Sequence, residues 1–367
     1  MSHDPDPAEI STLLADRIEE VIRSLALDVD KWGRRKAYCF PPWINHPKPK
    51  LEVELHPRPG KWNCWIDGKR GDALDLVAAV LSLGQTRGAR GPALKWAREF
   101  LGIAGRYDDA AWKERVAEAN RRRQAREAQA ARELAEARRT MWARWVHAPL
   151  LQPGDHGWEY LKARGVDLGQ PPFDRRLPRA IRYSPQELWF DPADRSERPD
   201  PAHVGPALLS AMTLHDGKFG SLHRIWINPE RPGEKADVRA PRKMWPSSEG
   251  AAIRLWRGAT NLSEGDAHKR KIEEDVVVCE GVEDGLSIAL LTPELRIHAA
   301  GSLPGLLSYV PPKVTRKLVI AADNDWSKPQ AQAMLNEACA RFEKEFRVPV
   351  FIARSPEGKD FNDVVTA

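Results

Sequence analysis

Cysteine is scarce in this sequence, and its spacing excludes the common metal and disulfide frameworks. The four cysteines lie far apart, and none belongs to a Cys-x-x-Cys pair. The first residues contain no apolar segment of a secretory signal. No run approaches the ~18 to 20 apolar residues that a membrane-spanning helix requires, because stretches such as VVVC and LVIAA are only strand-length. We therefore expect a reduced, cytoplasmic protein with no membrane role.

Charge is nearly balanced over the whole chain but unevenly distributed. The 367 residues include 57 Lys and Arg against 52 Asp and Glu, a net charge of +5. Basic residues dominate the first two thirds, and clustered acids mark the end. The 14 Trp fit either core packing or base stacking. A chain of this length predicts two or three domains.

The N-terminal part combines helical and strand patterns. Residues 8 to 26 carry apolar side chains at helical spacing, and residues 38 to 66 alternate like β-strands. Asp72 stands where the N-cap of a following helix belongs. Together these patterns predict a small α+β module over residues 1–104.

The segment from 105 to 147 is rich in Ala, Arg and Glu and predicts one long charged helix. It lacks Gly and Pro from about residue 106 onward, and apolar positions are sparse until Met141. Two interpretations stay open: a solvated spacer between domains, or a helix whose Arg122 to Arg126 cluster contacts nucleic-acid phosphates.

Strand signals return in residues 148–262, which we expect to form a basic α+β subdomain. The segment 148–202 is rich in Pro, and the following strands flank Asp216-Gly217, a turn typical of a hairpin. Residues 263–367 then alternate strand, helix, strand, strand, helix, strand. This order predicts an α/β domain, with a mostly parallel sheet and helices on both faces.

Acidic residues follow three of these predicted strands. Glu280 follows VVVC, Asp323 and Asp325 follow LVIAA, and Asp360 lies shortly after VFIA. Ligands collect at the carboxyl ends of parallel strands. Carboxylates that converge there repel one another unless a cation neutralises them, and Mg²⁺ prefers such oxygens while leaving positions for phosphates. The pattern indicates phosphoryl or nucleotidyl transfer.

The order of these motifs resembles the Toprim domain shared by primases, topoisomerases and some nucleases. The resemblance covers roughly residues 263–367 and rests on Glu280-Gly281 followed by Asp284, on Asp323-x-Asp325, and on the small-residue turn Gly301-Ser302. The closing segment Lys359-Asp360-Phe361-Asn362-Asp363 is similar to the KDxND motif of phage and plasmid primases.

The resemblance implies a role for each matching residue. Glu280 would organise metal or act as acid/base, and Asp323 and Asp325 would bind Mg²⁺ or Mn²⁺. Asp284 and Asp360 would supplement the metal site. We therefore expect a catalytic set of Glu280, Asp323 and Asp325.

The flanking segments resemble those of primases. Arg224 and Lys243 lie in a segment similar to the basic subdomain before the Toprim domain, where cations hold nucleotide or template phosphates. Lys359 is a further candidate for such a contact. Asp363 either joins the site or caps the final turn.

The N-terminal region resembles the zinc-binding module of primases with half of its ligands missing. Cys39 and Cys64 stand where ligand pairs are expected, but Pro42 and Asp67 replace their partners. A closed zinc site needs four N or S donors, and His46 and Asp67 are the alternative donors nearby. We expect no zinc and a degenerate template-binding module.

These features favour a DNA primase that makes short RNA primers on single-stranded DNA from NTPs, in a prophage or plasmid system. A topoisomerase is disfavoured because there are only five Tyr and no room for a DNA gate. A Toprim nuclease is an alternative, although the GxxxxGK[ST] loop of its frequent ATPase partner is missing. A non-catalytic module for single-strand binding or replisome recruitment also stays open. Because no helicase motif follows Asp363, we expect a separate replicative helicase as partner.

Overall fold

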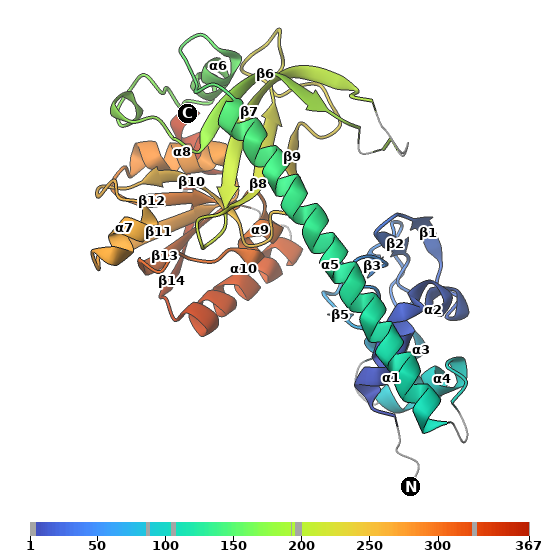
Figure 1. Ribbon diagram of the computed structural model, residues 1–367. Helices are drawn as coiled ribbons and strands as arrows, with labels where there is room; N and C mark the ends of the chain where they lie inside the picture. Colours follow the sequence, from blue (N-terminus) through green and yellow to red (C-terminus); the bar gives the residue numbers. More distant parts are fainter. Residues whose placement is uncertain are drawn as a thin grey trace. The chain divides into compact units, whose positions relative to one another are not determined.

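The computed structural model describes residues 5–85, 89–103, 108–191, 193–194, 200–324 and 329–366. The chain forms two compact units, residues 1–133 (unit 1) and 134–367 (unit 2). Figure 1 shows the elements of both, coloured along the sequence. No helix in the described ranges is both long enough and apolar enough to cross a membrane.

Unit 1 consists of an antiparallel five-stranded sheet and a group of helices. The strands pair in chain order from β1 to β5. Their bounds are β1 (Val29–Trp32), β2 (Lys36–Cys39), β3 (Leu51–Glu54), β4 (Trp62–Cys64) and β5 (Arg70–Gly71). The helices are α1 (Pro7–Asp16), α2 (Ile18–Ser24), α3 (Ala73–Leu81), α4 (Arg90–Phe100) and the first part of α5 (Asp109–His147).

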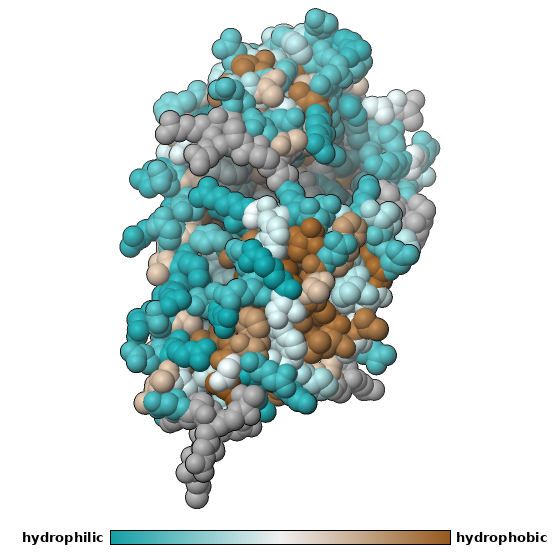
Figure 2. Space-filling view, turned by 90° about the vertical axis from the view of Figure 1, so that its right-hand side faces the viewer, coloured by the Kyte–Doolittle hydropathy of each residue, from teal (hydrophilic) through white to brown (hydrophobic). Residues whose placement is uncertain are grey.

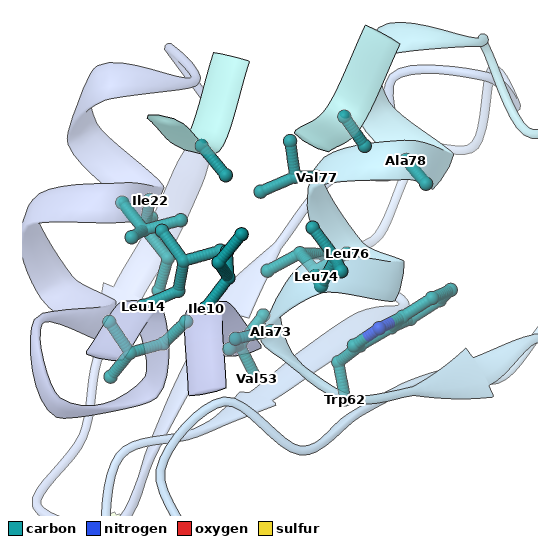
Figure 3. Packing of buried hydrophobic residues seen from close by; sticks show 14 of the residues in the cluster. Ile10, Leu14, Ile22, Val53, Trp62, Ala73, Leu74, Leu76, Val77 and Ala78 are labelled. Carbon is teal, nitrogen blue, oxygen red and sulfur yellow. The ribbon is translucent and has the colours of Figure 1, made fainter. Parts of the chain in front are cut away.

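The core of unit 1 lies where its N-terminal helices meet α3 and the sheet. Figure 3 shows Ile10 and Leu14 facing Leu76 and Val77, with Trp62 below α3. Asp72 caps α3 as predicted, in a capping box whose other member is Asp75. Burial of this apolar cluster therefore stabilises unit 1, and the cap defines where α3 begins.

The predicted helix over residues 8 to 26 is two helices. Arg17 interrupts it with a non-helical backbone, φ −114° and ψ 30°. The break lets α1 and α2 each bury its own apolar residues. Amphipathic spacing alone does not reveal such a change of direction, because both halves keep the same period.

The surface of unit 1 includes large apolar side chains. Figure 2 shows one face of the molecule, on which hydrophilic residues predominate and apolar ones form smaller patches. Among the exposed large apolar residues of unit 1 are Trp32, Trp65, Leu81 and Leu83.

The long helix predicted for 105–147 is α5, which begins at Asp109 and ends at His147. Its first turns pack Trp112 and Val116 into the core of unit 1. Arg122 and Arg126 of the basic cluster both pair with Asp16, at N–O distances of 3.0 and 2.9 Å. Two cations of this cluster are therefore engaged within unit 1.

Unit 2 is built on a continuous nine-stranded sheet in the order β14-β13-β11-β12-β10-β7-β8-β9, with β6 paired to β7. Its strands are β6 (Ile181–Trp189), β7 (His203–Thr213), β8 (Phe219–Trp226), β9 (Arg242–Trp245), β10 (Ala252–Arg257), β11 (Glu274–Cys279), β12 (Arg296–Ala299), β13 (Thr315–Ala322) and β14 (Val350–Arg354). Its other helices are α6 (His156–Ala163), α7 (Glu264–Lys269), α8 (Val282–Leu291), α9 (Leu303–Ser308), α10 (Pro329–Arg341) and α11 (Phe361–Thr366), with single turns at Phe173–Arg175 and Phe342–Phe346.

The C-terminal half of this sheet is parallel and covered on both faces, as predicted. Strands β14, β13, β11 and β12 run parallel. Alternate residues of β11 enter different cores: Val277 packs with residues of α8, whereas Val276 and Val278 pack with residues of α9 and α10. The other strands of the sheet, β6 to β10, pair antiparallel.

The predicted hairpin is present as β7 and β8. Leu214 N–H donates to the carbonyl oxygen of Lys218 at 2.8 Å, and Gly217 has φ +83°. The domain boundary predicted at 262/263 falls between β10 and β11. Both strands belong to the same continuous sheet. The four predicted domain ranges stay predictions.

Candidate active site

The carboxyl ends of β11 and β13 carry the acids that the sequence singled out. Glu280 directly follows β11, and Asp323 directly follows β13, the neighbouring parallel strand. Asp284 lies in the first turn of α8. All three side chains are partly buried. Asp325 lies outside the described residues.

Asp284 and Asp360 converge on one backbone amide. Asn362 N–H donates to Asp284 Oδ1 at 3.3 Å and to Asp360 Oδ1 at 3.1 Å. This shared donor brings the carboxylate of Asp284, in α8, next to that of Asp360, which is 76 positions later in the sequence.

The electrostatics of Asp284 indicate that its neighbours are acidic. Burial, followed by the charges of Asp360 and Asp323, raises its pKa to about 7. Burial likewise raises the pKa of the Cys279 thiol, and the charges of Asp284, Asp323 and Glu280 add to that shift. Four of the predicted acids therefore act on the same small region, where a cation would relieve their repulsion.

Two asparagines that sequence reasoning missed hold these loops in place. Asn324, the middle residue of Asp323-x-Asp325, donates its side-chain amide to the carbonyl oxygens of Ser355 and Gly358, at 3.1 and 2.9 Å. Asn362 donates its side-chain amide to Arg164 O at 2.7 Å and Ser287 Oγ at 3.0 Å. Both amides connect the closing motif to neighbouring segments.

Asp363 caps the final turn, one of the two roles considered for it. Its Oδ2 accepts from the backbone N–H of Lys359 at 2.5 Å and of Asp360 at 3.4 Å. Gly358 precedes this turn with φ +64°, and a Cβ there would lie 2.4 Å from Asp363 Oδ2. The tight turn therefore requires Gly358 and brings Asp363 close to the backbone.

The donor set fits Mg²⁺ better than a closed metal cage. Within the described ranges, no three His, Cys, Asp or Glu side chains are close enough to hold a metal by themselves. Mg²⁺ commonly takes one or two carboxylates and completes its octahedron with water and substrate phosphates. Asp284, Asp323 and Asp360 offer carboxylates of that kind at one edge of the sheet.

Next to Asp284 lies a buried network that no sequence pattern predicts. Glu283 pairs with Lys235 at 2.9 Å and accepts from Tyr160 Oη–H at 2.7 Å. Burial acts to raise the pKa of Glu283, but Lys235 and the hydrogen bonds outweigh it and lower the pKa to about 2. This network ties α8 to α6 and to the segment after β8. Its members come from distant segments, so no local motif signals it.

The predicted cations Arg224 and Lys243 lie together, but on the other face of the sheet from α8. They are directly opposite each other on β8 and β9. Arg224 is buried and pairs with Glu187 at 3.2 Å, and Glu187 also pairs with Arg144 of α5 at 2.8 Å. Lys243 Nζ lies 4.0 Å from the Trp189 ring centroid. Both cations contact the core cluster that contains Trp189 and Trp226.

Arg242, one residue before Lys243, faces the side of the sheet that carries α8. Side chains alternate along β9, so Arg242 shares a face with Met244, and a Cβ on Gly301 would lie 2.6 Å from Met244 Sδ. Burial lowers the pKa of His223 to about 4; the Glu283 charge opposes this shift, and Arg242 and Lys235 add to it. Arg242 is exposed. Its positive charge lies on the same face of the sheet as His223 and Glu283.

Lys359 approaches the acids directly. Its Nζ lies 4.0 Å from Asp323 Oδ2, and the side chain is exposed. The backbone carbonyl of Lys359 accepts from Asn324 N–H at 2.8 Å. This places an exposed cation at the same edge of the sheet as Asp323. The role of each site residue, Arg224, Lys243 and Lys359 included, stays a prediction.

In unit 1, Cys39 and Cys64 flank Leu51 on adjacent strands. Cys39 and Leu51 are register partners, and Leu51 is also the partner of Cys64. Both thiols are buried, and burial raises the pKa of Cys39 to about 12. Asp67, the candidate substitute donor, accepts from Trp43 Nε1–H at 3.0 Å. The thiols are therefore packed as apolar groups, and low zinc content stays a prediction.

Comparison with protein families matches two segments of the chain. Residues 275–367 match the Toprim domain. Residues 132–255 match a family described as a domain of unknown function (DUF7146). The C-terminal α/β region, with its acids at the strand ends, is thus a Toprim domain.

Several solved structures resemble the chain at low identity. The zinc-binding and RNA polymerase domains of the Aquifex aeolicus primase match at 15% identity, covering 98% of this chain and 82% of that one, with a TM-score of 0.38. The RNA polymerase domain of the Mycobacterium tuberculosis primase, in complex with double-stranded DNA, matches at 16% identity, covering 64% and 76%, with a TM-score of 0.38. The primase fragment of the bacteriophage T7 primase-helicase protein matches at 16% identity, covering 43% and 57%, with a TM-score of 0.30. No curated protein matches the sequence.

Proposed function

We propose that this protein is a DNA primase of a prophage or plasmid system, which joins NTPs into short RNA primers on single-stranded DNA. The observation that supports this most is the convergence of Asp284, Asp323 and Asp360 at the carboxyl edge of a Toprim domain. The Lys359 to Asp363 motif resembles that of phage and plasmid primases. Arg242 on β9 and Lys359 in the closing motif are the candidate cations for binding the phosphates of the nucleotide.

One or two of the carboxylates of Asp284, Asp323 and Asp360 would hold Mg²⁺ together with water and substrate phosphates, with Asp325 as a further candidate. When bound, Mg²⁺ neutralises the carboxylates and the phosphates of an incoming nucleotide. Asn362 N–H orients two of these carboxylates in advance, because it donates to both. Glu280 directly follows β11, and its charge acts on the Cys279 thiol together with those of Asp284 and Asp323. It is the candidate acid/base for the primer hydroxyl.

The phosphate-binding cations on the acidic side are Lys359 and Arg242. Lys359 Nζ lies 4.0 Å from Asp323, and Arg242 belongs to the same sheet face as α8. Both are exposed and can therefore exchange water for phosphate without breaking a buried pair. Arg224 and Lys243 stay candidates for template contact at a separate location on the opposite face.

The experiment is incubation of the full chain with single-stranded DNA, labelled NTPs and Mg²⁺, followed by sizing of products. We expect short labelled RNA that requires both template and Mg²⁺. Asp323→Ala is the test variant. Asp275→Ala is the matched control, since Asp275 lies at the other end of β11 and pairs only with Arg316 and Lys317 among the described residues.

The remaining candidate functions predict different products in the same assay. Shortened template without new RNA would indicate a Toprim nuclease. Bound template with neither RNA nor cleavage would indicate a binding or recruitment module. Either result, obtained with wild-type protein, contradicts the primase proposal.

Unit 1 is the candidate template-binding module, and its zinc content can be tested separately. Because Cys39 and Cys64 are buried apolar neighbours of Leu51, elemental analysis should find well under one zinc per chain. A chelator should leave the unfolding temperature unchanged, whereas a structural zinc would contribute much of the folding energy. Stoichiometric zinc would contradict this expectation.

A further inference from the structure

A cavity of 1160 Å³ lies at the other edge of the same sheet, at the amino ends of the parallel strands. Its lining includes Arg296, the first residue of β12, and Arg257, which pairs with Arg296 in register at the end of β10. Lys313 and Phe346 also line it, shortly before β13 and β14 begin. Strands of six to eight residues span about 20 to 26 Å, so this cavity is separate from the acidic end.

Arginine dominates the polar lining of this cavity. Arg176, Arg179 and Arg257 approach one another there, and within the described parts of the chain none of them forms an ion pair with a carboxylate. Burial lowers the pKa of Arg257, and the charges of Arg179 and Arg296 lower it further. Mutual repulsion of this kind is relieved when an anion binds.

The acids that line the cavity are already paired. Glu264 accepts two hydrogen bonds from Arg254 and lies 3.2 Å from His298 Nε2. Asp216 pairs with Lys218 at 2.9 Å. Both lining carboxylates therefore pair with other cations. The charges of Asp266 and Glu264 offset part of the repulsion at Arg257, but arginines outnumber acids in the lining, and the cavity keeps a surplus of positive charge.

The walls of the cavity are partly apolar and include a packed aromatic ring. Arg176 lies over the Trp256 ring, 3.7 Å from its centroid, and Trp256 Nε1–H donates to Pro293 O at 2.7 Å. Phe173 packs edge-on against the same ring. The lining further includes Leu177, Pro311 and Phe346. A planar guanidinium held on an aromatic ring is pre-organised for bidentate binding of phosphate.

We propose that this cavity is a second phosphate site, which binds the phosphates of a nucleotide through Arg176, Arg179 and Arg257 while the apolar wall contacts the sugar and base. Its volume exceeds what a single drug-sized ligand needs, about 300 to 1,000 Å³, so it accommodates a nucleoside triphosphate or the end of a nucleic-acid strand. These two ligands share the chemistry that the arginines recognise. The site is independent of the catalytic role proposed for the acids.

Calorimetric titration of the full chain in EDTA tests this site without the metal-dependent one. ATP is the first probe, and a short single-stranded oligonucleotide is the second. With Arg179→Glu/Arg257→Glu, the affinity for at least one probe should fall tenfold or more, because two charge-assisted contacts become repulsive. If only the affinity for ATP falls, the ligand of the cavity is a free nucleotide. If only the affinity for the oligonucleotide falls, the ligand is a nucleic-acid strand.

Two controls isolate the effect. Arg270→Glu makes the same charge change on an exposed residue at the end of α7 that does not line the cavity, and it should alter affinity by less than about twofold at 0.15 M salt. The milder Arg179→Gln/Arg257→Gln variant guards against misfolding, with circular dichroism as the check. If both probes bind Arg179→Gln/Arg257→Gln as tightly as wild type, or neither probe binds wild type, the proposal is wrong.

Discussion

The two ends of the parallel strands in unit 2 carry opposite charge. At the carboxyl ends, burial and the charges of Asp360 and Asp323 raise the pKa of Asp284 to about 7. At the amino ends, burial lowers the pKa values of Arg176 and Arg257, and the charges of neighbouring arginines lower them further. In each cluster, like charges repel one another unless an ion of opposite charge binds.

One apolar sheet therefore supports two separate sites of opposite charge. The residues between the two ends, such as Val277, Val278 and Ile320, are fully or almost fully buried. The apolar layer keeps both sets of charges at its edges, where loops from distant segments bring them together. We expect the acidic end to require a cation and the basic end to require an anion.

The largest expected effect follows from removing a carboxylate at the acidic end. Asp323→Ala should lower Mg²⁺-dependent primer synthesis about a thousandfold, equivalent to ~4 kcal/mol of transition-state stabilisation. Single-turnover primer assays measure it, and Asp275→Ala serves as the matched control. Equal synthesis by Asp323→Ala and wild type would sink the acidic end as a catalytic site.

A second test uses the stability of the metal-free protein. The folded pKa of Asp284, about 7, lies above its unfolded value near 3.8, so ionisation destabilises the fold as pH rises between these values. Asp284→Asn should therefore stabilise the protein at pH 8 by on the order of 2 to 4 kcal/mol, and by almost nothing below pH 4. Urea unfolding in EDTA measures the gain, and added Mg²⁺ should reduce it. A gain that is equal at both pH values would exclude a charge effect.

The third test asks which face of β9 serves the acidic end. Arg242→Ala should lower synthesis ten- to a hundredfold through loss of a charge-assisted phosphate contact of ~1.5 to 3 kcal/mol. Lys243→Ala is the matched control on the opposite face, next to Trp189. The apparent KM for NTP and the salt dependence of DNA binding distinguish nucleotide from template contact. If Lys243→Ala loses as much nucleotide binding as Arg242→Ala, the assignment by face fails.

The smallest effect is expected at the basic end. Arg257→Gln removes one of the mutually repelling cations and should raise the stability of the ligand-free protein by less than about 1 kcal/mol at low salt. The gain should vanish near 1 M NaCl, where charges are screened within about 3 Å. Thermal unfolding at the two salt concentrations measures it, with Arg270→Gln as control. A gain that persists in high salt would contradict the repulsion.

Local patterns sufficed for several parts of this fold. Helix α3 begins after Asp72 because a short acidic side chain can accept the first free amides of a helix, and the β7–β8 hairpin follows from Asp216-Gly217. The break at Arg17 was missed because a helical period continues through it. The N-terminal zinc-module resemblance concerned ligand spacing, whereas burial of Cys39 and Cys64 is a property of packing.

The alternation of strands and helices in residues 263–367, the Toprim motifs and the acids that follow three of the strands can all be predicted from the sequence. These signals are local, because periodicity and strand-end position depend on neighbouring residues. Only the tertiary structure decided which cations face those acids, since a shift of one residue along β9 moves a side chain to the other face of the sheet. It also decided that Asn362 serves two carboxylates and that Arg176, Arg179 and Arg257 share one cavity. Such groupings join residues far apart in the chain, and spacing in the sequence does not encode their distance in space.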